Sequence, residues 1–267
     1  MSAHRLYPTD LIIPVGIAAL LAIVVAGCDP AFDSLNARDD RVYSLYGVLD
    51  PAADTQWVRV EPLPEPTSEG TAPDLDATVT LENLDTGQTW EFHDSLMVVQ
   101  TEPQHNFWTT APIRAGTRYR VEARRSDDAT TWATTTTPAQ PPTIVRTADD
   151  NAKDSGILIQ DAEKLAGVKA RYFGIYGYVY DVSYYAATRK TSAGYLTEIR
   201  PARDIERLGI LGIDSLKVIA AAGGPDWPKW ENYRRTSVFD LALPDSFSNV
   251  RGGHGMVSGI YRTTTSP

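Results

Sequence analysis

The chain contains a single thiol, Cys28, which follows an uncharged apolar run at residues 11–27. The two residues directly before it, Ala26 and Gly27, have the smallest side chains. With one cysteine, the chain cannot form an intramolecular disulfide and lacks the paired cysteines of zinc and redox sites. Any cysteine chemistry is therefore confined to the junction between the apolar run and the rest of the chain.

The sequence Val25-Ala26-Gly27-Cys28 resembles the lipobox of bacterial lipoproteins, in which an aliphatic and two small residues precede a cysteine. The resemblance implies that a signal peptidase recognises Val25, Ala26 and Gly27 and cuts before Cys28, whose thiol accepts a diacylglyceryl group. Residues 1–27 are then a signal peptide, and the lipid holds the protein on a membrane. The alternative is an uncleaved signal anchor with an incidental cysteine, although a run of about 17 residues is short for a spanning helix of roughly 20.

Other chemistry-bearing patterns are missing from the sequence. His93, His105 and His254 remain after the signal peptide, and none lies in an HExxH motif. There is no G-x-S-x-G nucleophile elbow and no P-loop, and we expect the glycines at 252–255 to form a bulge or tight turn. The acidic pairs lie in predicted loops without EF-hand spacing. We therefore expect no catalytic residues, no metal site and no cofactor.

Aromatic residues supply the candidate contacts. Trp227, Trp230 and Tyr233 lie in or near a loop rich in glycine and proline at 223–228. Exposed aromatic rings stack on sugars or anchor protein partners, so these three residues are predicted to contact a ligand or partner. Burial in the core is the alternative. For the alternating Tyr176, Tyr178 and Tyr180, one face of a strand packed into the core is the favoured interpretation.

The charge balance bears on the class of partner. The formal net charge is −9, and removal of residues 1–27 leaves it unchanged because Arg5 and Asp10 cancel. An acidic protein is a poor candidate for non-specific binding to nucleic acid or anionic lipid. We therefore predict no nucleic-acid partner.

Alternation of apolar and polar residues predicts a mainly β protein. Strands are expected at 42–49, 57–61, 78–83, 89–93, 106–108, 118–123 and 132–137, with a hairpin turn at 85–88. Their spacing predicts an immunoglobulin- or fibronectin-like sandwich over 41–138, after a polar tether at 28–40. Prolines at 138–142 suggest a boundary before a β-rich domain at 143–267, which contains a strand at 238–243 and a short helix at 202–209 ended by Gly209. The alternative is one larger domain with an ordinary loop at 138–142.

The layout resembles β-rich surface lipoproteins of Bacteroidota-type bacteria, through the strands at 42–49 and 57–61, the passage at 119–142 and the glycines near 249–255. The resemblance implies a lipid-anchored place in the cell envelope, on the outer membrane rather than the inner, although Asp29 favours inner-membrane retention in enteric-type bacteria. We expect a non-enzymatic binding or scaffolding role, with envelope proteins or polysaccharide as partners. The alternatives are a glycan hydrolase with paired carboxylates and an assembly factor that presents a sheet edge.

Overall fold

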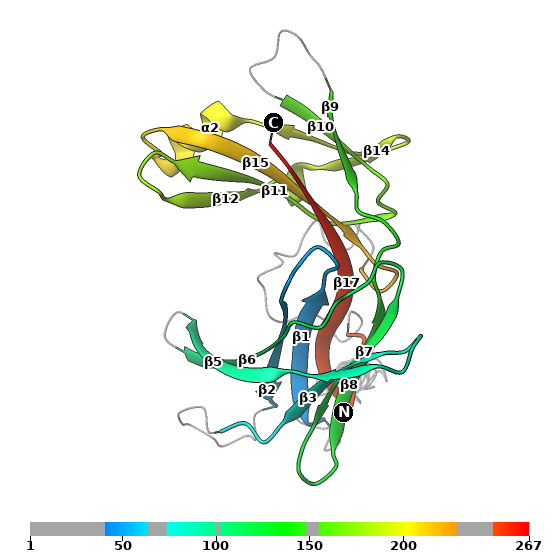
Figure 1. Cartoon of the computed structure of the whole chain (residues 1–267). Helices are drawn as coiled ribbons and strands as arrows, with labels where there is room; N and C mark the ends of the chain where they lie inside the picture. Colours follow the sequence, from blue (N-terminus) through cyan, green and yellow to red (C-terminus); the bar gives the residue numbers. More distant parts are fainter. Residues whose placement is uncertain (1–40, 64–73, 100–101, 148–154, 229–247, 267) are drawn as a thin grey trace, which may run out of the picture. The chain divides into compact units, whose positions relative to one another are not determined.

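A computed structural model describes residues 41–63, 74–99, 102–147, 155–228 and 248–266. Strands dominate these ranges, which confirms the prediction of a mainly β protein (Figure 1). In the part of the chain described, no helix combines the length and the apolar character needed to cross a membrane. The predicted signal peptide, tether and strand at 238–243 lie outside the described residues.

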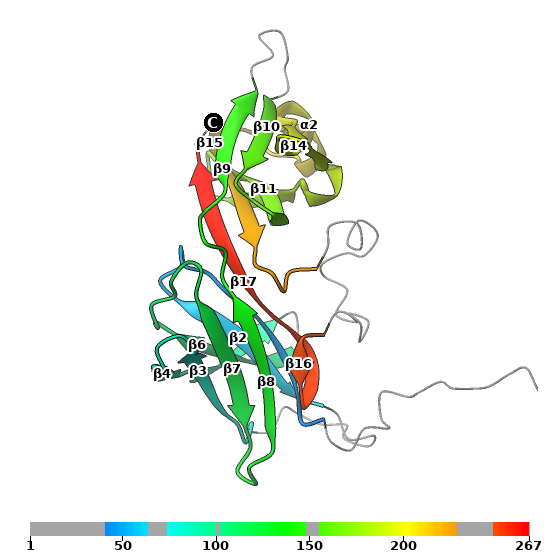
Figure 2. The same ribbon diagram turned by 90° about the vertical axis from the view of Figure 1, so that its right-hand side faces the viewer.

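Two sheets face each other in the first region and enclose one hydrophobic core. One layer contains β1 (Tyr43–Leu49), β2 (Gln56–Pro62), β6 (Glu102–Thr109), β5 (His93–Val99) and the start of β17 (Gly253–Thr265). The other contains β16 (Val250–Arg251), β8 (Thr130–Thr136), β7 (Arg118–Arg124), β3 (Thr78–Asn83) and β4 (Thr89–Glu91), of which β7, β8 and β16 are seen in Figure 2. Inward residues such as Leu45 and Val121 are fully buried, and they alternate with outward ones. This arrangement is the predicted immunoglobulin-like sandwich.

A buried tyrosine strengthens the likeness to immunoglobulin and fibronectin domains. The Tyr119 side chain is fully buried at the start of β7, and its Oη accepts a hydrogen bond of 2.8 Å from the backbone N–H of Arg114. A tyrosine that bonds the backbone a few residues upstream is the tyrosine corner of these sandwiches. The start of the strand predicted at 118–123 therefore has the local geometry of that fold.

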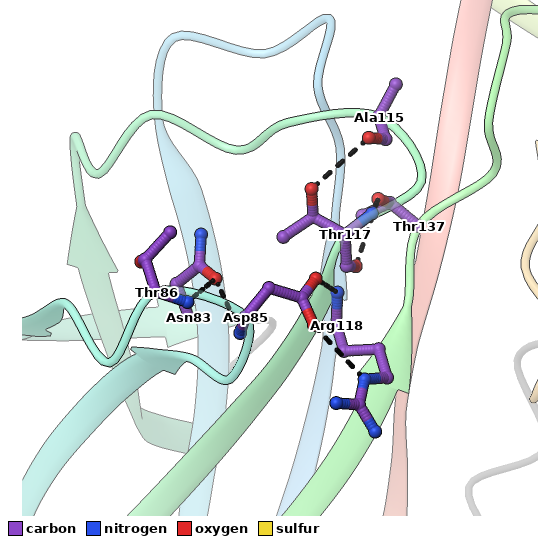
Figure 3. Close-up of polar contacts among 7 residues, drawn as sticks. All are labelled: Asn83, Asp85, Thr86, Ala115, Thr117, Arg118 and Thr137. Carbon is purple, nitrogen blue, oxygen red and sulfur yellow. Dashed lines mark hydrogen bonds and ion pairs between the residues drawn. The ribbon is translucent and has the colours of Figure 1, made fainter.

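The predicted hairpin at 85–88 joins β3 to β4. Figure 3 shows that Asn83 Oδ1 accepts from the backbone N–H groups of Asp85 and Thr86, at 3.0 and 3.1 Å. Asp85 in turn accepts from the backbone N–H of Arg118 at 3.1 Å and from its Nε at 3.3 Å. The backbone bond from Arg118 lowers the pKa of Asp85 below its usual value, so the turn carries a charged link to β7.

A second pair of layers encloses a separate core. One layer consists of β12 (Val179–Ser183), β11 (Lys164–Gly174) and β15 (Ile213–Gly223), which join the end of β17. The other consists of β13 (Arg189–Thr191), β14 (Gly194–Ile199), β10 (Ser155–Gln160) and β9 (Thr143–Thr147). The short helices η3 (Tyr185–Ala187) and α2 (Pro201–Leu208) complete the region. The core includes Ile157, Ile159, Tyr172 and Val218, all fully buried.

Strand β17 belongs to both regions, as the red strand of Figure 1 shows. Its first half pairs in parallel with β1, from Gly253 opposite Tyr43 to Gly259 opposite Leu49. Its second half pairs antiparallel with β15. The C-terminal strand thus completes the sandwich that the sequence placed at 41–138. The division at 138–142 into two domains stays a prediction.

Glycines just before β17 and at its start have a backbone role. Gly252 has φ +65°, and Gly255 has φ +123° with its α-carbon so close to β1 that an added Cβ would lie 2.2 Å from the Leu45 carbonyl oxygen. Only glycine fits such an approach at such a dihedral angle. This agrees with the predicted tight turn or bulge.

The prediction of a buried tyrosine stripe is wrong for two of its three members. Residues 175–178 form the turn between β11 and β12, closed by a 2.8 Å bond from the Gly174 N–H to the Tyr178 carbonyl. Gly177, with φ +80°, lets the chain reverse. Tyr176 and Tyr178 are consequently 69% and 64% exposed, whereas Tyr180 packs against the second core.

Candidate functional site

A pocket of about 450 Å³ opens in the second region among the end of β12, η3, β13, β14 and α2. Four arginines and two acids supply its charged lining. They are Arg189, Arg200, Arg203, Arg207, Glu198 and Asp204. The size falls within the range of small-molecule sites, which is roughly 300–1,000 Å³. The pocket is therefore the candidate functional site.

Helix α2 supplies half of the charged lining. Pro201 opens it with a preset φ and no N–H to lose, and Gly209 ends it in the left-handed region at φ +64°. Residues three and four apart share one face of a helix, so Arg203, Asp204 and Arg207 all reach the pocket. This is the short helix that the sequence predicts, with the predicted end at Gly209.

Asp204 fixes the helix to the sheet below it. The residue is 5% exposed, and Oδ2 accepts hydrogen bonds from the hydroxyl groups of Tyr172, at 2.6 Å, and of Tyr184. The backbone N–H of Arg200 donates to Tyr184 Oη at 3.0 Å. A buried carboxylate requires such donors, because an unpaired one is costly. The network thereby holds the start of α2 against β11 and the end of β12.

The same network raises the pKa values of both tyrosines. For Tyr172 and Tyr184, burial is the largest cause, and the hydrogen bond to Asp204 follows. Burial disfavours the phenolate, and a neighbouring carboxylate repels it. Both phenols are therefore neutral hydrogen-bond donors at neutral pH.

Glu198 is occupied by its neighbour. Its Oε2 lies 2.7 Å from Arg200 Nη2, and this hydrogen bond lowers the pKa of Glu198. Arg207 Nη2 lies 3.6 Å from Asp204 Oδ1. The two acids of the pocket are thus engaged, while the arginines outnumber them.

The sequence-predicted contact residues lie elsewhere. The structure buries Trp227, which is 7% exposed and lies over Gly223, where an added Cβ would be 2.5 Å from the indole Cγ. Lys164 Nζ donates to the Trp227 carbonyl at 2.8 Å. The loop at 223–228 is therefore present, but its tryptophan packs inward, as the alternative of core burial describes. A ligand or partner contact by Trp227 stays a prediction.

Several predicted site residues lie outside the described residues. These are Val25, Ala26, Gly27, Cys28, Trp230 and Tyr233. Among the ranges that the structure covers, no group of three or more His, Cys, Asp or Glu side chains could hold a metal ion. His93, His105 and His254 do not line the pocket.

Sequence reasoning missed the arginine-lined pocket. The helical spacing of Arg200, Arg203 and Arg207 is a local signal that could have marked a basic helix face. Arg189 and Thr197 carry no such signal, because they come from neighbouring strands of the sheet.

Comparison with solved structures gives remote likenesses. A pullulanase from Anoxybacillus sp. LM18-11 matches with 8% identity and a TM-score of 0.23, over 67% of this chain and 23% of the pullulanase. The chicken CNTN1 FN1-FN3 domains match with 11% identity and a TM-score of 0.28, over 67% of this chain and 57% of that one. A tetra-tandem repeat from the extending region of a large adhesion protein matches with 12% identity and a TM-score of 0.22, over 84% and 48%.

Sequence comparison identifies the family. No curated protein matches the chain. One family model, described as "Domain of unknown function (DUF4249)", matches residues 29–217, which is most of the chain and reaches from the first region into β15 of the second. The chain therefore belongs to the DUF4249 family.

Proposed function

We propose that this protein is a lipid-anchored protein of the bacterial cell envelope whose exported part binds a ligand and does not catalyse a reaction. The observation that carries the binding role is the pocket of about 450 Å³ in the second region. Its position over a carboxylate that is already satisfied by two tyrosines supports a preformed site.

The state of the two acids favours binding over hydrolysis. A glycosidase needs one carboxyl group with a raised pKa as general acid. In the pocket, the pKa of Glu198 is lowered by Arg200, and Asp204 accepts two buried hydroxyl groups. The lowered pKa makes Glu198 unsuited to give up a proton to a leaving group near neutral pH, so paired-carboxylate hydrolysis has no support from this site.

The anchor is proposed from the lipobox at residues 25–28. Cys28 carries the lipid and attaches the protein to a membrane, with the outer membrane favoured by the resemblance to surface lipoproteins. Envelope proteins or polysaccharide are the proposed partners. The net charge of −9 argues against nucleic acid.

Intact mass spectrometry tests the anchor. The protein purified from its native membrane is compared with a Cys28→Ala variant. We expect a mature N-terminus at an acylated Cys28 that the variant lacks. A chain that starts at Met1 in the wild type would refute lipidation and indicate a signal anchor.

Crosslinking in cells and glycan arrays test the binding role. We expect the wild type to retain an envelope protein or a polysaccharide. An Arg203→Glu substitution, which reverses one charge in the pocket, should abolish retention. If crosslinked cells and arrays both gave no partner, the binding role would lose its support while the anchor result stood.

A second candidate function, strand addition to a client, rests on β5. This strand ends the eight-stranded sheet, and Leu96 and Val98 on it are 57% and 72% exposed. An apolar edge strand is a template for pairing with another chain. Lysine at Leu96 and Val98 should abolish client binding without unfolding the protein. Retained binding would exclude this edge.

A further inference from the structure

We propose that the arginine-lined pocket holds an acidic ligand by its oxyanion, a carboxylate or a phosphate, with Arg189, Arg203 and Thr197 as the recognising residues. The inference rests on the proposed binding function and adds the chemical class of the ligand. It is carried by the charge of the lining, the start of α2 and one buried hydroxyl group.

The charge of the lining is positive and only partly compensated. Among the residues that the structure describes, Arg189 and Arg203 take part in no ion pair, although both line the pocket. Glu198 pairs with Arg200, and Asp204 lies 3.6 Å from Arg207 and accepts two tyrosine hydroxyl groups, so each acid already has its own partners. Guanidinium groups bind carboxylate and phosphate through two parallel hydrogen bonds, which makes an oxyanion the matching ligand.

The arginines at the start of α2 also indicate an anionic ligand. The helix has no side-chain cap at its N-terminus, and Arg200 and Arg203 lie at this end. The N-terminus of a helix carries partial positive charge and favours anions, so arginines gain nothing from the dipole there. Their presence at this end is expected where an anion is to be bound.

Thr197 adds an independent observation. The residue is 2% exposed and lines the pocket from β14, and its Oγ1 has no hydrogen-bond partner in the described part of the chain. Buried hydroxyl groups are nearly always bonded. A ligand oxygen in the pocket would supply the missing partner, and Thr197 Oγ1 would donate to it.

The accessibility and the volume of the pocket limit which ligands can enter it. The side chains of Arg200 and Arg207 are 44% and 61% exposed, so a solute reaches the pocket directly. A volume of about 450 Å³ accepts a sugar acid or a small phosphorylated compound. The shared chemistry is a single oxyanion on a compact polar body.

Isothermal titration of the full-length protein in detergent with galacturonate, inorganic phosphate and neutral galactose tests the proposal. We expect saturable binding of at least one anion, weakened by salt, and none of galactose. Arg189→Gln and Arg203→Gln should each weaken it by about tenfold or more. Arg146→Gln, on β9 of the same region, is the matched control and should leave it unchanged. Binding of galacturonate alone would identify a carboxylate ligand, and of phosphate alone a phosphoryl ligand.

Thr197→Val separates recognition from folding. Valine keeps the shape and removes the hydroxyl group, so we expect weaker anion binding at an unchanged or higher melting temperature. Absence of saturable binding for both anions, or equal affinity in wild type and Arg203→Gln, would overturn the proposal. The lipidated mass of the mature protein would be unaffected by that outcome, so the anchor is judged separately.

Discussion

Each of the two regions buries an aspartate, and the two carboxylates are satisfied in different ways. Asp50, at the end of β1 and 1% exposed, accepts from the Ala52 N–H at 2.9 Å and pairs with the Arg262 guanidinium of β17. Asp204 instead accepts two tyrosine hydroxyl groups. An arginine neutralises the first carboxylate, whereas neutral phenols solvate the second.

This difference bears on which arginines are free to contact a ligand. Asp50 of the first region uses Arg262, from the half of β17 that pairs with β15, to fasten that strand beside the end of β1. In the second, tyrosines from β11 and the end of β12 hold α2 in place, and Arg203 on that helix remains available to a ligand.

The largest expected effect tests whether the regions are independent. Leu45 is fully buried in the first core, and Leu45→Ala should lower the free energy of unfolding by about 3 kcal/mol. Because β17 pairs with both β1 and β15, we expect both regions to unfold together at a lower urea concentration. Hydrogen exchange measured region by region checks this.

The control for that experiment is Leu96→Ala, at an exposed position. It should change stability little, because a surface truncation leaves no cavity. If β10 and β14 kept their wild-type protection from hydrogen exchange in Leu45→Ala, the two cores would unfold separately. The shared strand β17 would then not couple them.

The next effect concerns the buried carboxylate of the second region. Asp204→Ala leaves two buried hydroxyl groups without an acceptor and should lower the free energy of unfolding by about 2 kcal/mol. Asp204→Asn retains an acceptor oxygen and should cost less. Chemical denaturation compares the two variants. Equal stability of Asp204→Ala and wild type would refute the role of Asp204 in holding α2 on the sheet.

The stability of the second region is expected to depend on alkaline pH through its buried tyrosines. The pKa values of Tyr172 and Tyr184 are raised in the folded protein, mainly by burial, whereas an unfolded tyrosine ionises near pH 10. The unfolded state therefore loses protons first, and stability falls as the pH rises above about 10. Tyr184→Phe removes one such group, so its stability should fall less steeply with pH.

Thermal unfolding between pH 8 and 11 measures this slope, and Tyr176→Phe, at an exposed position, is the matched control. The control should follow the wild type. An identical slope in Tyr184→Phe would mean that this phenol does not govern the alkaline transition.

In the first region, the tyrosine corner should contribute less. Tyr119→Phe removes one neutral hydrogen bond to the Arg114 N–H and should cost about 1 kcal/mol. Urea denaturation of this variant and of Tyr178→Phe, which is exposed, gives the comparison. If Tyr119→Phe lowered the free energy of unfolding as much as Asp204→Ala, the polar contacts of both regions would contribute equally to stability.

The smallest effect is expected from the exposed ion pair of β11 and β12. The side-chain hydrogen bond from Arg171 lowers the pKa of Asp181 to about 2, and Arg171→Ala should return it toward its usual value. The lowered pKa stabilises the folded protein above the unfolded value, and this gain is lost as the pH falls toward about 2. NMR titration of the Asp181 carboxyl carbon measures the shift.

Since Asp181 is more than a third exposed, solvent screens the pair, and Arg171→Ala should cost less than about 0.5 kcal/mol at pH 7. A larger loss would mean that surface ion pairs, and not buried groups alone, distinguish the second region from the first.

Local chemistry made parts of the fold predictable. Asn83 and Gly87 specify the hairpin turn, because an asparagine side chain caps turn amides and glycine adopts the positive φ of +73°. Gly209 likewise marks the end of α2. Alternation identified most strands, since one face of each is buried.

The same reasoning failed where a local pattern crossed a turn. The alternation of Tyr176, Tyr178 and Tyr180 continues through residues 175–178, where Gly177 reverses the chain. Residues of the turn cannot share a strand face, so two tyrosines became exposed. For Trp227, the loop was recognisable, but its burial depends on Gly223, against which the indole packs.

The sequence by itself determined the β class, the sites of several turns and the helix at 201–208, because each follows from the preferences of neighbouring residues. It also supplies the lipobox on which the proposed anchor rests. Only the tertiary structure decided that β17 joins β1 across some 210 residues, and that Arg189, Thr197 and Arg203 line one pocket. Such pairings depend on the mutual fit of whole sheets, and no short-range pattern encodes that fit.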